Sequence, residues 1–234
     1  LTNENLFSLT ELPQRFGIVG SGPIGCEMAQ TFARLGSEVF LFERSDHILS
    51  KEDKEAAAIV QRQFERDGVR LMLNSQDMSV AAHNDGRIAV RVKQNGEYTE
   101  TVVDQLLVAV GRAPNVDGLN LEAVNVAFNC DGVEVNDYLQ TTNPGIYAAG
   151  DICSKYKFTH AADFQARIVI QNSLFALGPF GKKRTSDLII PWATYTSPEV
   201  AHVGLYDHEA QAAGTEYDTY IQHFADVDRA ILEG

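Results

Sequence analysis

Three glycines, Gly20, Gly22 and Gly25, constrain the fold of this chain more than any other feature. A short apolar segment, residues 15–19, precedes them, and residues 26–35 follow with apolar side chains at helical spacing. This order predicts a strand, a tight turn and a helix. The first glycine permits the turn, the second lets a ligand approach the backbone, and the third lets the helix pack on the strand. The spacing therefore predicts a dinucleotide site with the phosphates at the helix N-terminus, and an ordinary turn between strand and helix is the alternative.

A carboxylate follows these glycines at the expected distance. Residues 38–43 form a second apolar segment that ends in Glu43, 18 residues after Gly25. An acidic residue at this place accepts hydrogen bonds from the ribose hydroxyls of NAD and repels the 2′-phosphate of NADP. Arg44 could turn toward a 2′-phosphate, although a solvated surface charge is its alternative interpretation. The sequence favours NAD, and NADP stays possible.

The next segments continue the same pattern. A capping box at residues 50–53 predicts a helix to about residue 67, and residues 69–73 predict a third strand. The order β-α-β-α-β is that of a Rossmann-like, doubly wound α/β domain. Turn signals at Asn84-Asp-Gly86 and Asn95-Gly96 then predict an inserted antiparallel meander. A fully buried strand at residues 106–110 is expected to return to the parallel sheet.

Three parts follow from this organisation. The first domain is expected at residues 1–117, a second part at 118–188 and a third at 189–234. In the later parts we expect short strands at 132–135 and 146–149, a helix at about 161–177 and a short helix at 208–213.

Two polar residues near helix starts have open interpretations. Glu27 lies two residues after Gly25, where a carboxylate usually interacts with the helix dipole. That position also lies beside the path of a bound nicotinamide. His160 precedes the expected helix at residue 161 and is interpreted as a residue near its N-cap.

Composition excludes several other functions. The chain has 19 Lys and Arg against 32 Asp and Glu, a net charge of −13, which disfavours nucleic acids and anionic membranes. No apolar run approaches the ~20 residues that a bilayer requires. Cys26, Cys130 and Cys153 lie far apart in the sequence, which favours a reducing, cytoplasmic setting over disulfides or a zinc site.

Four ordered motifs resemble those of flavoprotein disulfide reductases, a family that includes mercuric reductase, dihydrolipoamide dehydrogenase and glutathione reductase. They are Gly20-Ser-Gly-Pro-Ile-Gly-Cys-Glu27, Ala109-Val-Gly-Arg-Ala-Pro-Asn115, Thr141-Thr-Asn-Pro-Gly-Ile-Tyr-Ala-Ala-Gly-Asp151 and Pro191-Trp-Ala-Thr-Tyr-Thr-Ser-Pro-Glu-Val-Ala201. The segment 158–162 and Pro191-Trp192 are most similar to the mercuric-reductase-like branch.

The resemblance implies a set of cofactor-binding residues. Residues of the glycine turn and Glu27 would hold NAD(H) against a flavin, Glu43 would bind the adenosine ribose, and the backbone near Met78 and Gly111 would bind the rest of the dinucleotide. Asp151 would bind the ribityl chain of FAD, with residues 159–161 near the isoalloxazine ring. The full set is Gly20, Ser21, Gly22, Pro23, Ile24, Gly25, Glu27, Glu43, Met78, Gly111, Asp151, Thr159, His160 and Ala161.

The chain also departs from the family pattern. The family begins with an FAD-binding glycine motif and a redox-active cysteine pair and ends with a catalytic histidine, whereas these 234 residues contain none of the three and begin with Leu1. We therefore expect a central fragment of an FAD-dependent, homodimeric oxidoreductase, with residues 118–188 from its FAD-binding domain and 189–234 from the start of its dimerisation domain. This enzyme would pass hydride from NAD(P)H to FAD and on to a disulfide or metal-ion acceptor. No catalytic residue and no metal site are expected in the fragment itself.

Other functions stay open. Dihydrolipoamide dehydrogenase is the alternative within the family, and a non-catalytic dinucleotide-binding or redox-sensing module is the alternative outside it. A methyltransferase could use the glycine turn for S-adenosylmethionine, but it would not explain the motif that ends at Asp151.

Overall fold

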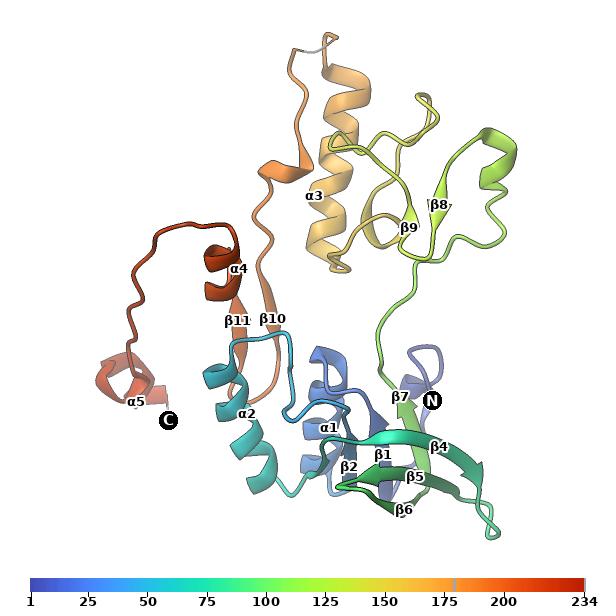
Figure 1. The fold of residues 1–234 in the computed structure, drawn as a ribbon, viewed down its shortest axis with the longest axis vertical. Coiled ribbons are helices and arrows are strands. Elements are labelled where there is room, and N and C mark those ends of the chain that lie inside the picture. Colours follow the sequence, from blue (N-terminus) through green and yellow to red (C-terminus); the bar gives the residue numbers. More distant parts are fainter. Residues whose placement is uncertain (179, 234) are drawn as a thin grey trace. The chain divides into compact units, whose positions relative to one another are not determined.

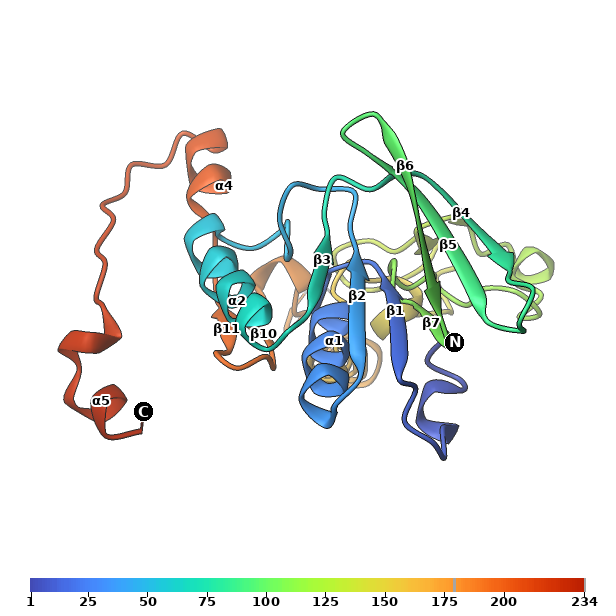
Figure 2. The same ribbon diagram turned by 90° about the horizontal axis from the view of Figure 1, so that it is seen from below.

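The computed structural model describes residues 1–178 and 180–233, which form two compact units, residues 1–203 and 204–234. The first unit, shown in Figure 1, contains a four-stranded parallel sheet with the order β3-β2-β1-β7, which can be followed in Figure 2. Its strands are β1 (Arg15–Val19), β2 (Glu38–Phe42), β3 (Arg70–Met72) and β7 (Gln105–Val108). This sheet confirms the expected doubly wound α/β fold.

An antiparallel meander is inserted between β3 and β7, as the turn signals predicted. It consists of β4 (Gln76–Ala82), β5 (Ile88–Gln94) and β6 (Glu97–Val103) in that order (Figure 2). Side chains alternate between the two faces of a strand, and β2 uses both faces. Val39 and Leu41 pack in one hydrophobic cluster with α1, whereas Phe40 and Phe42 pack in a second cluster with the meander.

Two helices follow the first two strands of the sheet. Helix α1 (Pro23–Leu35) begins directly after Gly22, includes Gly25 in its first turn and ends at Gly36, whose φ of +110° favours glycine. Helix α2 (Lys54–Arg66) begins after Asp53, whose side chain accepts the N–H groups of Glu55 at 2.9 Å and Ala56 at 3.1 Å. The capping box expected to begin at Ser50 is therefore wrong, because Asp53 is the N-cap.

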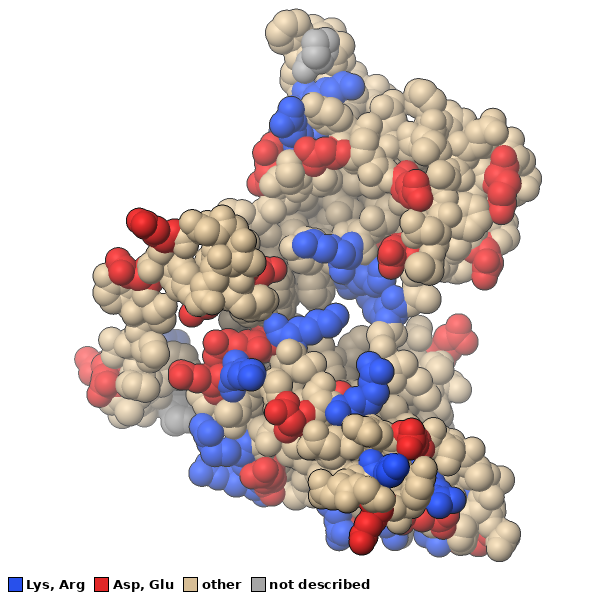
Figure 3. Space-filling view, viewed as in Figure 1, with Lys and Arg blue, Asp and Glu red and all other residues tan. Residues whose placement is uncertain are grey.

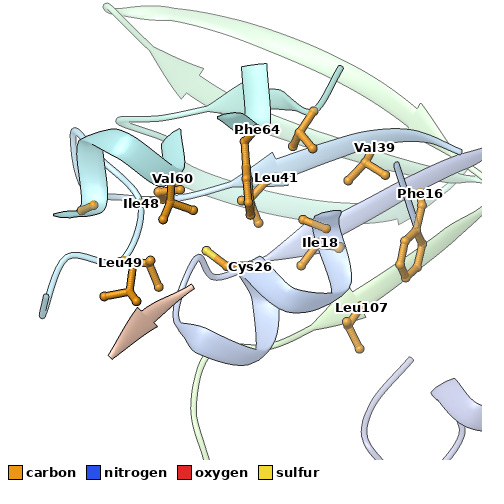
Figure 4. Packing of buried hydrophobic residues seen from close by; sticks show 14 of the residues in the cluster. Phe16, Ile18, Cys26, Val39, Leu41, Ile48, Leu49, Val60, Phe64 and Leu107 are labelled. Atoms are coloured by element: carbon orange, nitrogen blue, oxygen red, sulfur yellow. The ribbon is translucent and has the colours of Figure 1, made fainter. Parts of the chain in front are cut away.

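The main core lies between the parallel sheet and its helices (Figure 4). Phe16 and Ile18 of β1 are fully buried, and the distance between the ring centroids of Phe16 and of Phe32 on α1 is 4.4 Å. Phe64 of α2 packs in the same core. Burial of large apolar side chains here stabilises the strand–turn–helix unit that carries the glycines.

Residues 106–110 are less buried than expected. The strand β7 ends at Val108, and the exposed fractions are 50% for Val108 and 69% for Val110. The prediction of a fully buried strand is wrong because β7 is at the edge of the sheet. Leu107 and Leu106 belong to the first and second hydrophobic clusters, and Ala109 packs against the first.

The rest of the first unit consists of short elements and one long helix. The prediction of a strand at 146–149 is wrong, because only an isolated bridge joins Gln140 and Tyr147 there. The expected helix at 161–177 begins two residues earlier and ends in a π-helical turn at Phe175. The remaining elements of this unit are η1 (Leu6–Ser8), η2 (Leu121–Val124), β8 (Phe128–Asn129), β9 (Gly132–Val133), η3 (Gly150–Ile152), α3 (Thr159–Ile170), η4 (Gln171–Phe175), η5 (Thr185–Asp187), β10 (Trp192–Thr194) and β11 (Val200–His202).

The second unit contains α4 (Asp207–Ala212), η6 (Phe224–Asp226) and α5 (Asp228–Glu233). Helix α4 confirms the short helix expected at 208–213.

On the face of the molecule that Figure 3 shows, acidic side chains are interspersed with basic ones. Within residues 1–178 and 180–233, no helix has both the length and the hydropathy to span a bilayer.

Candidate functional site

The candidate site lies where the carboxyl ends of three neighbouring strands meet. After β1, the Gly20 N–H donates to the carbonyl of Phe42 at the end of β2, at 2.9 Å. After β7, the Ala109 N–H donates to the carbonyl of Val19 at 2.8 Å. Doubly wound folds bind their ligands at this edge of the sheet. Gly111 follows in the same loop with a φ of +131°, a conformation that favours glycine.

The three glycines of the turn meet different requirements. Gly20 has a φ of +97°, and a Cβ atom there would lie 2.6 Å from the Ala109 carbonyl oxygen. A Cβ atom on Gly25 would lie 1.9 Å from the Gly20 carbonyl oxygen. A Cβ atom on Gly22 would have no neighbour within 4 Å, and its φ of −70° and ψ of −176° suit any residue. Packing within the chain therefore explains Gly20 and Gly25, whereas Gly22 borders open space.

The N-terminus of α1 is available to an anion. Gly22 is the N-cap and has no side chain that could accept hydrogen bonds from the first N–H groups of the helix. These N–H groups also have no helical partner, because no helical carbonyl group precedes them. Pro23 and Ile24 occupy the first two helical positions, and both are exposed. The helix dipole adds a positive potential at this end. The arrangement fits a phosphate group.

Glu43 is bound to the glycine turn by several hydrogen bonds. Its Oε2 accepts the N–H of Ser21 at 3.0 Å and the hydroxyl of Ser21 at 2.7 Å, and its Oε1 accepts the N–H of Ser45 at 2.9 Å. Partial burial raises the pKa of Glu43, but the hydrogen bonds from Ser21, Ser45 and the Arg44 backbone together outweigh burial and lower the pKa below its usual value. Glu43 is therefore ionised at neutral pH, and the Arg44 side chain is exposed beside it.

Glu27 and Met78 have contacts that sequence reasoning did not identify. The Oε1 atom of Glu27 accepts the Tyr195 N–H at 2.9 Å, which ties α1 to the segment after β10. The side chain of Met78 is partly buried against the cluster that contains Phe40 and Phe42. The donor in the Glu27 contact is a backbone N–H, so the sequence carries no signal for it.

Asp151 forms an ion pair with Arg112. The distance between Asp151 Oδ2 and Arg112 Nη2 is 2.6 Å, and Arg112 Nη1 also donates to the carbonyl of Lys157 at 3.0 Å. The preceding Gly150 has a φ of +80°, and its N–H donates to the buried Gln165 side chain at 2.7 Å. The structure thus joins two motifs, that of Arg112 and that of Asp151, which the sequence showed only as separate segments.

His160 lies in the first turn of α3 and connects this helix to the segment that contains Pro191. Its Nε2 lies 2.7 Å from the Pro191 carbonyl oxygen, a hydrogen bond that requires the proton on Nε2. The N-cap of α3 is Phe158 and no side chain caps this helix, so His160, the second helical residue, lies near the N-cap as expected. Thr159 is exposed and Ala161 is fully buried. A cavity of about 460 Å³ lies beside His160, lined by His160, Pro191, Trp192, Ala193, Tyr195, Ala201, His202 and Val203.

The three cysteines are separate and unpaired. Burial, with the nearby charges of Glu43 and Glu27, raises the pKa of the Cys26 thiol. Burial also raises the pKa of Cys153, to about 11, against a smaller opposing effect of Lys157. In the described part of the chain, no group of three or more His, Cys, Asp or Glu residues could hold a metal ion.

The parallel sheet and its glycine turn define the class of doubly wound α/β proteins. A sequence model described as pyridine nucleotide-disulphide oxidoreductase matches residues 1–166, and one described as the dimerisation domain of these oxidoreductases matches residues 190–234. The chain belongs to the pyridine nucleotide-disulphide oxidoreductase family. This assignment confirms the resemblance that the four motifs indicated.

Relatives with two different activities are similar to the chain. A mercuric reductase of Lysinibacillus sphaericus is 37% identical over 99% of this chain and 42% of its own length. A dihydrolipoyl dehydrogenase of Thermus scotoductus is 35% identical over 87% of this chain and 43% of its own length. The structure of RclA, an HOCl-induced flavoprotein disulfide reductase from Escherichia coli, has a TM-score of 0.86 and 30% identity, covering 100% of this chain and 52% of RclA. The chain thus spans about half or less of the length of these relatives.

Proposed function

We propose that this chain binds NAD(H) at the glycine turn, with Glu43 selecting NADH over NADPH. The pyrophosphate would lie against Gly22 and the N-terminus of α1, where the backbone is open and positively polarised. Gly111 would border the dinucleotide from the loop after β7, and the backbone of the Met78 strand would lie further along it. Glu27 would lie near the nicotinamide.

The position of the Glu43 carboxylate, which Ser21 holds against the glycine turn, is the observation that carries this proposal. The carboxylate accepts two hydrogen bonds on Oε2 and one on Oε1, so Oε1 can accept a further hydrogen bond from a ribose hydroxyl. The negative charge of Glu43 repels a 2′-phosphate. Its hydrogen bonds with Ser21 place the carboxylate against the glycine turn, so the phosphate site and the ribose site are adjacent.

Titration with NADH tests the proposal on the 234-residue chain. Binding is followed by the fluorescence of NADH in the wild type and in Glu43→Gln. We expect the variant to raise the Kd for NADH by about tenfold, since a hydrogen bond to a charged group contributes roughly 1.5–3 kcal/mol. Glu65→Gln, at an exposed position on α2, is the matched control and should leave the Kd unchanged. Equal Kd values for wild type and Glu43→Gln would reject the role of Glu43.

For the protein that contains this segment, we propose an FAD-dependent oxidoreductase. Asp151 would bind the ribityl chain of FAD, and Thr159, His160 and Ala161 would lie near the isoalloxazine ring. The residues present are compatible with this group, because Asp151 is partly exposed and the N-terminus of α3 carries no capping side chain. Bound flavin would supply the hydride chemistry between NAD(P)H and the acceptor. Arg112 would have to share or release Asp151 when FAD binds.

The electron acceptor is proposed from the relatives. Mercuric ion is our first candidate, and a disulfide substrate such as lipoamide is the second, because both classes of relative cover most of this chain. The complete flavoprotein, supplied with NADH, should oxidise NADH faster with Hg²⁺ than with lipoamide. Faster turnover with lipoamide would favour the dihydrolipoamide dehydrogenase alternative. NADH binding without oxidation by either acceptor would favour a redox-sensing module.

A homodimer is proposed for the complete protein. The match of the family's dimerisation domain to residues 190–234 supports this proposal. Sedimentation of the complete protein would test it, and a monomer at micromolar concentration would reject it.

A further inference from the structure

Three side chains on one face of α1 contact the segment that follows β10. Glu27, Gln30 and Arg34 are spaced three and four residues apart, so they share one face of the helix. Glu27 accepts the N–H of Tyr195, Gln30 bonds both backbone groups of Ser197, and Arg34 Nη2 lies 3.5 Å from the Ser197 carbonyl oxygen. The match to the dimerisation domain begins at residue 190, so this face of α1 joins the two matched regions.

Gln30 uses its whole amide group in these contacts. Its Oε1 accepts the Ser197 N–H at 2.7 Å, and its Nε2 donates to the Ser197 carbonyl at 2.8 Å and to Asp67 Oδ2 at 2.8 Å. The residue is only 5% exposed. When both N–H groups and the carbonyl oxygen of a side-chain amide form hydrogen bonds, the amide has one orientation in which all of them are made. Gln30 therefore fixes Ser197 on α1 in a single position.

Tyr195 is bound to α1 through its backbone N–H group. Its side chain is 73% exposed, and its N–H donates to Glu27 Oε1 at 2.9 Å. Among the residues that the structure describes, none donates a hydrogen bond to Glu27 Oε2. One carboxylate oxygen of Glu27 thus binds the segment, while the other stays available to a ligand at the same end of α1.

We infer that Gln30 is a positioning residue for Glu27. By fixing Ser197, it places the Tyr195 N–H against the Glu27 carboxylate and orients that carboxylate toward the dinucleotide site. Gln30 thereby couples the site to the first strands of the dimerisation region. The inference rests on the proposed NAD(H) site for its functional part, whereas the contacts among Gln30, Ser197, Tyr195 and Glu27 do not.

Amide hydrogen exchange tests the coupling without any ligand. In the 234-residue chain, Gln30→Met removes the amide but keeps the length of the side chain. We expect exchange at the N–H groups of Ser197 and Tyr195 to accelerate by about tenfold or more. Gln63→Met is the matched control, because Gln63 also donates to Asp67, at 2.8 Å, and has no hydrogen bond to residues 195–197 in the described part of the chain. Unchanged exchange at Tyr195 in Gln30→Met would overturn the inference, provided that the variant is folded by circular dichroism.

NADH affinity tests the functional part of the inference. Gln30→Met and Glu27→Gln should each raise the Kd for NADH by about three- to tenfold, and the double variant should lose little more than either single variant. A sum of two independent losses, or no loss in Gln30→Met, would overturn the positioning role. A wild-type chain that binds no NADH would instead reject the proposed function, while the exchange measurement would still decide whether Gln30 places Tyr195 on Glu27.

Discussion

Ser21 donates two hydrogen bonds to the same carboxylate oxygen of Glu43, one from its N–H at 3.0 Å and one from its hydroxyl at 2.7 Å. Ser21 is 1% exposed and lies between Gly20 and Gly22, so the glycine turn and the carboxylate after β2 form one connected unit. The position of Glu43 therefore depends on the side chain of a residue inside the glycine motif.

Ser21→Ala removes the shorter of these bonds. We expect a stability loss of about 1 kcal/mol and an increase in the Kd for NADH of about three- to tenfold. Ser37→Ala is the matched control, because Ser37 is also buried and its hydroxyl donates to the Pro13 carbonyl at 2.6 Å, away from the site. The control should lose similar stability and keep its NADH affinity. Equal affinity losses in both variants would show a general effect of destabilisation.

The lowered pKa of Glu43 predicts how stability depends on pH. A carboxylate whose pKa is lower in the folded state contributes stability above its unfolded pKa, about 4.3 for glutamate, and loses it as pH falls through the folded pKa. The stabilities of the wild type and Glu43→Gln from urea unfolding should therefore differ at pH 7, and the difference should shrink as the pH falls below about 4.3. A constant difference at both pH values would contradict the assigned cause of the pKa shift.

Alanine substitutions separate the structural glycine from the proposed ligand-binding glycine. Gly25→Ala places a Cβ atom 1.9 Å from the Gly20 carbonyl oxygen, so we expect destabilisation of about 3 kcal/mol, measured by urea unfolding. Gly22→Ala adds a Cβ atom in open space and should change stability by less than about 0.5 kcal/mol. It should nevertheless weaken NADH binding, because the methyl group occupies the approach to the backbone. Unchanged affinity in Gly22→Ala would place the ligand elsewhere.

The three thiols differ in burial, so we expect them to react at different rates. Cys130 is exposed and should react first with a disulfide reagent. Cys153 should react more slowly at pH 8 and faster as pH rises toward its pKa of about 11, because the thiolate is the reactive form. Cys26 should react only when denaturant unfolds the chain. Mass spectrometry after timed quenching identifies each site, and early modification of Cys26 would contradict the buried core around α1.

Local patterns predicted the strand–turn–helix unit because every part of it carries its own signal. Glycine spacing, helical periodicity and the acid after β2 all depend on nearby residues, and the structure contains β1, α1 and β2 at nearly the expected bounds. The roles assigned to Gly22 and Glu43 stay predictions. The meander was equally predictable, since Asn-Asp-Gly and Asn-Gly turns determine hairpins locally.

Contacts between distant segments were not predictable in this way. The Tyr195 N–H that bonds Glu27 and the Pro191 carbonyl that bonds His160 are backbone groups, which leave no mark on the sequence. Edge position explains why the apolar run 106–110 is only partly buried, because an apolar strand does not reveal whether it has one neighbour or two. Residues 146–149 lack a partner strand and form only one bridge.

Comparison of NADH and NADPH binding tests the central claim most directly. The claim is that the chain binds a dinucleotide at the Gly20–Gly25 turn and that ionised Glu43 excludes a 2′-phosphate. Calorimetric titration at pH 7 should give a Kd for NADH at least about tenfold lower than that for NADPH, and Glu43→Gln should reduce this ratio. Tighter binding of NADPH, or a ratio that does not respond to Glu43→Gln, would contradict it.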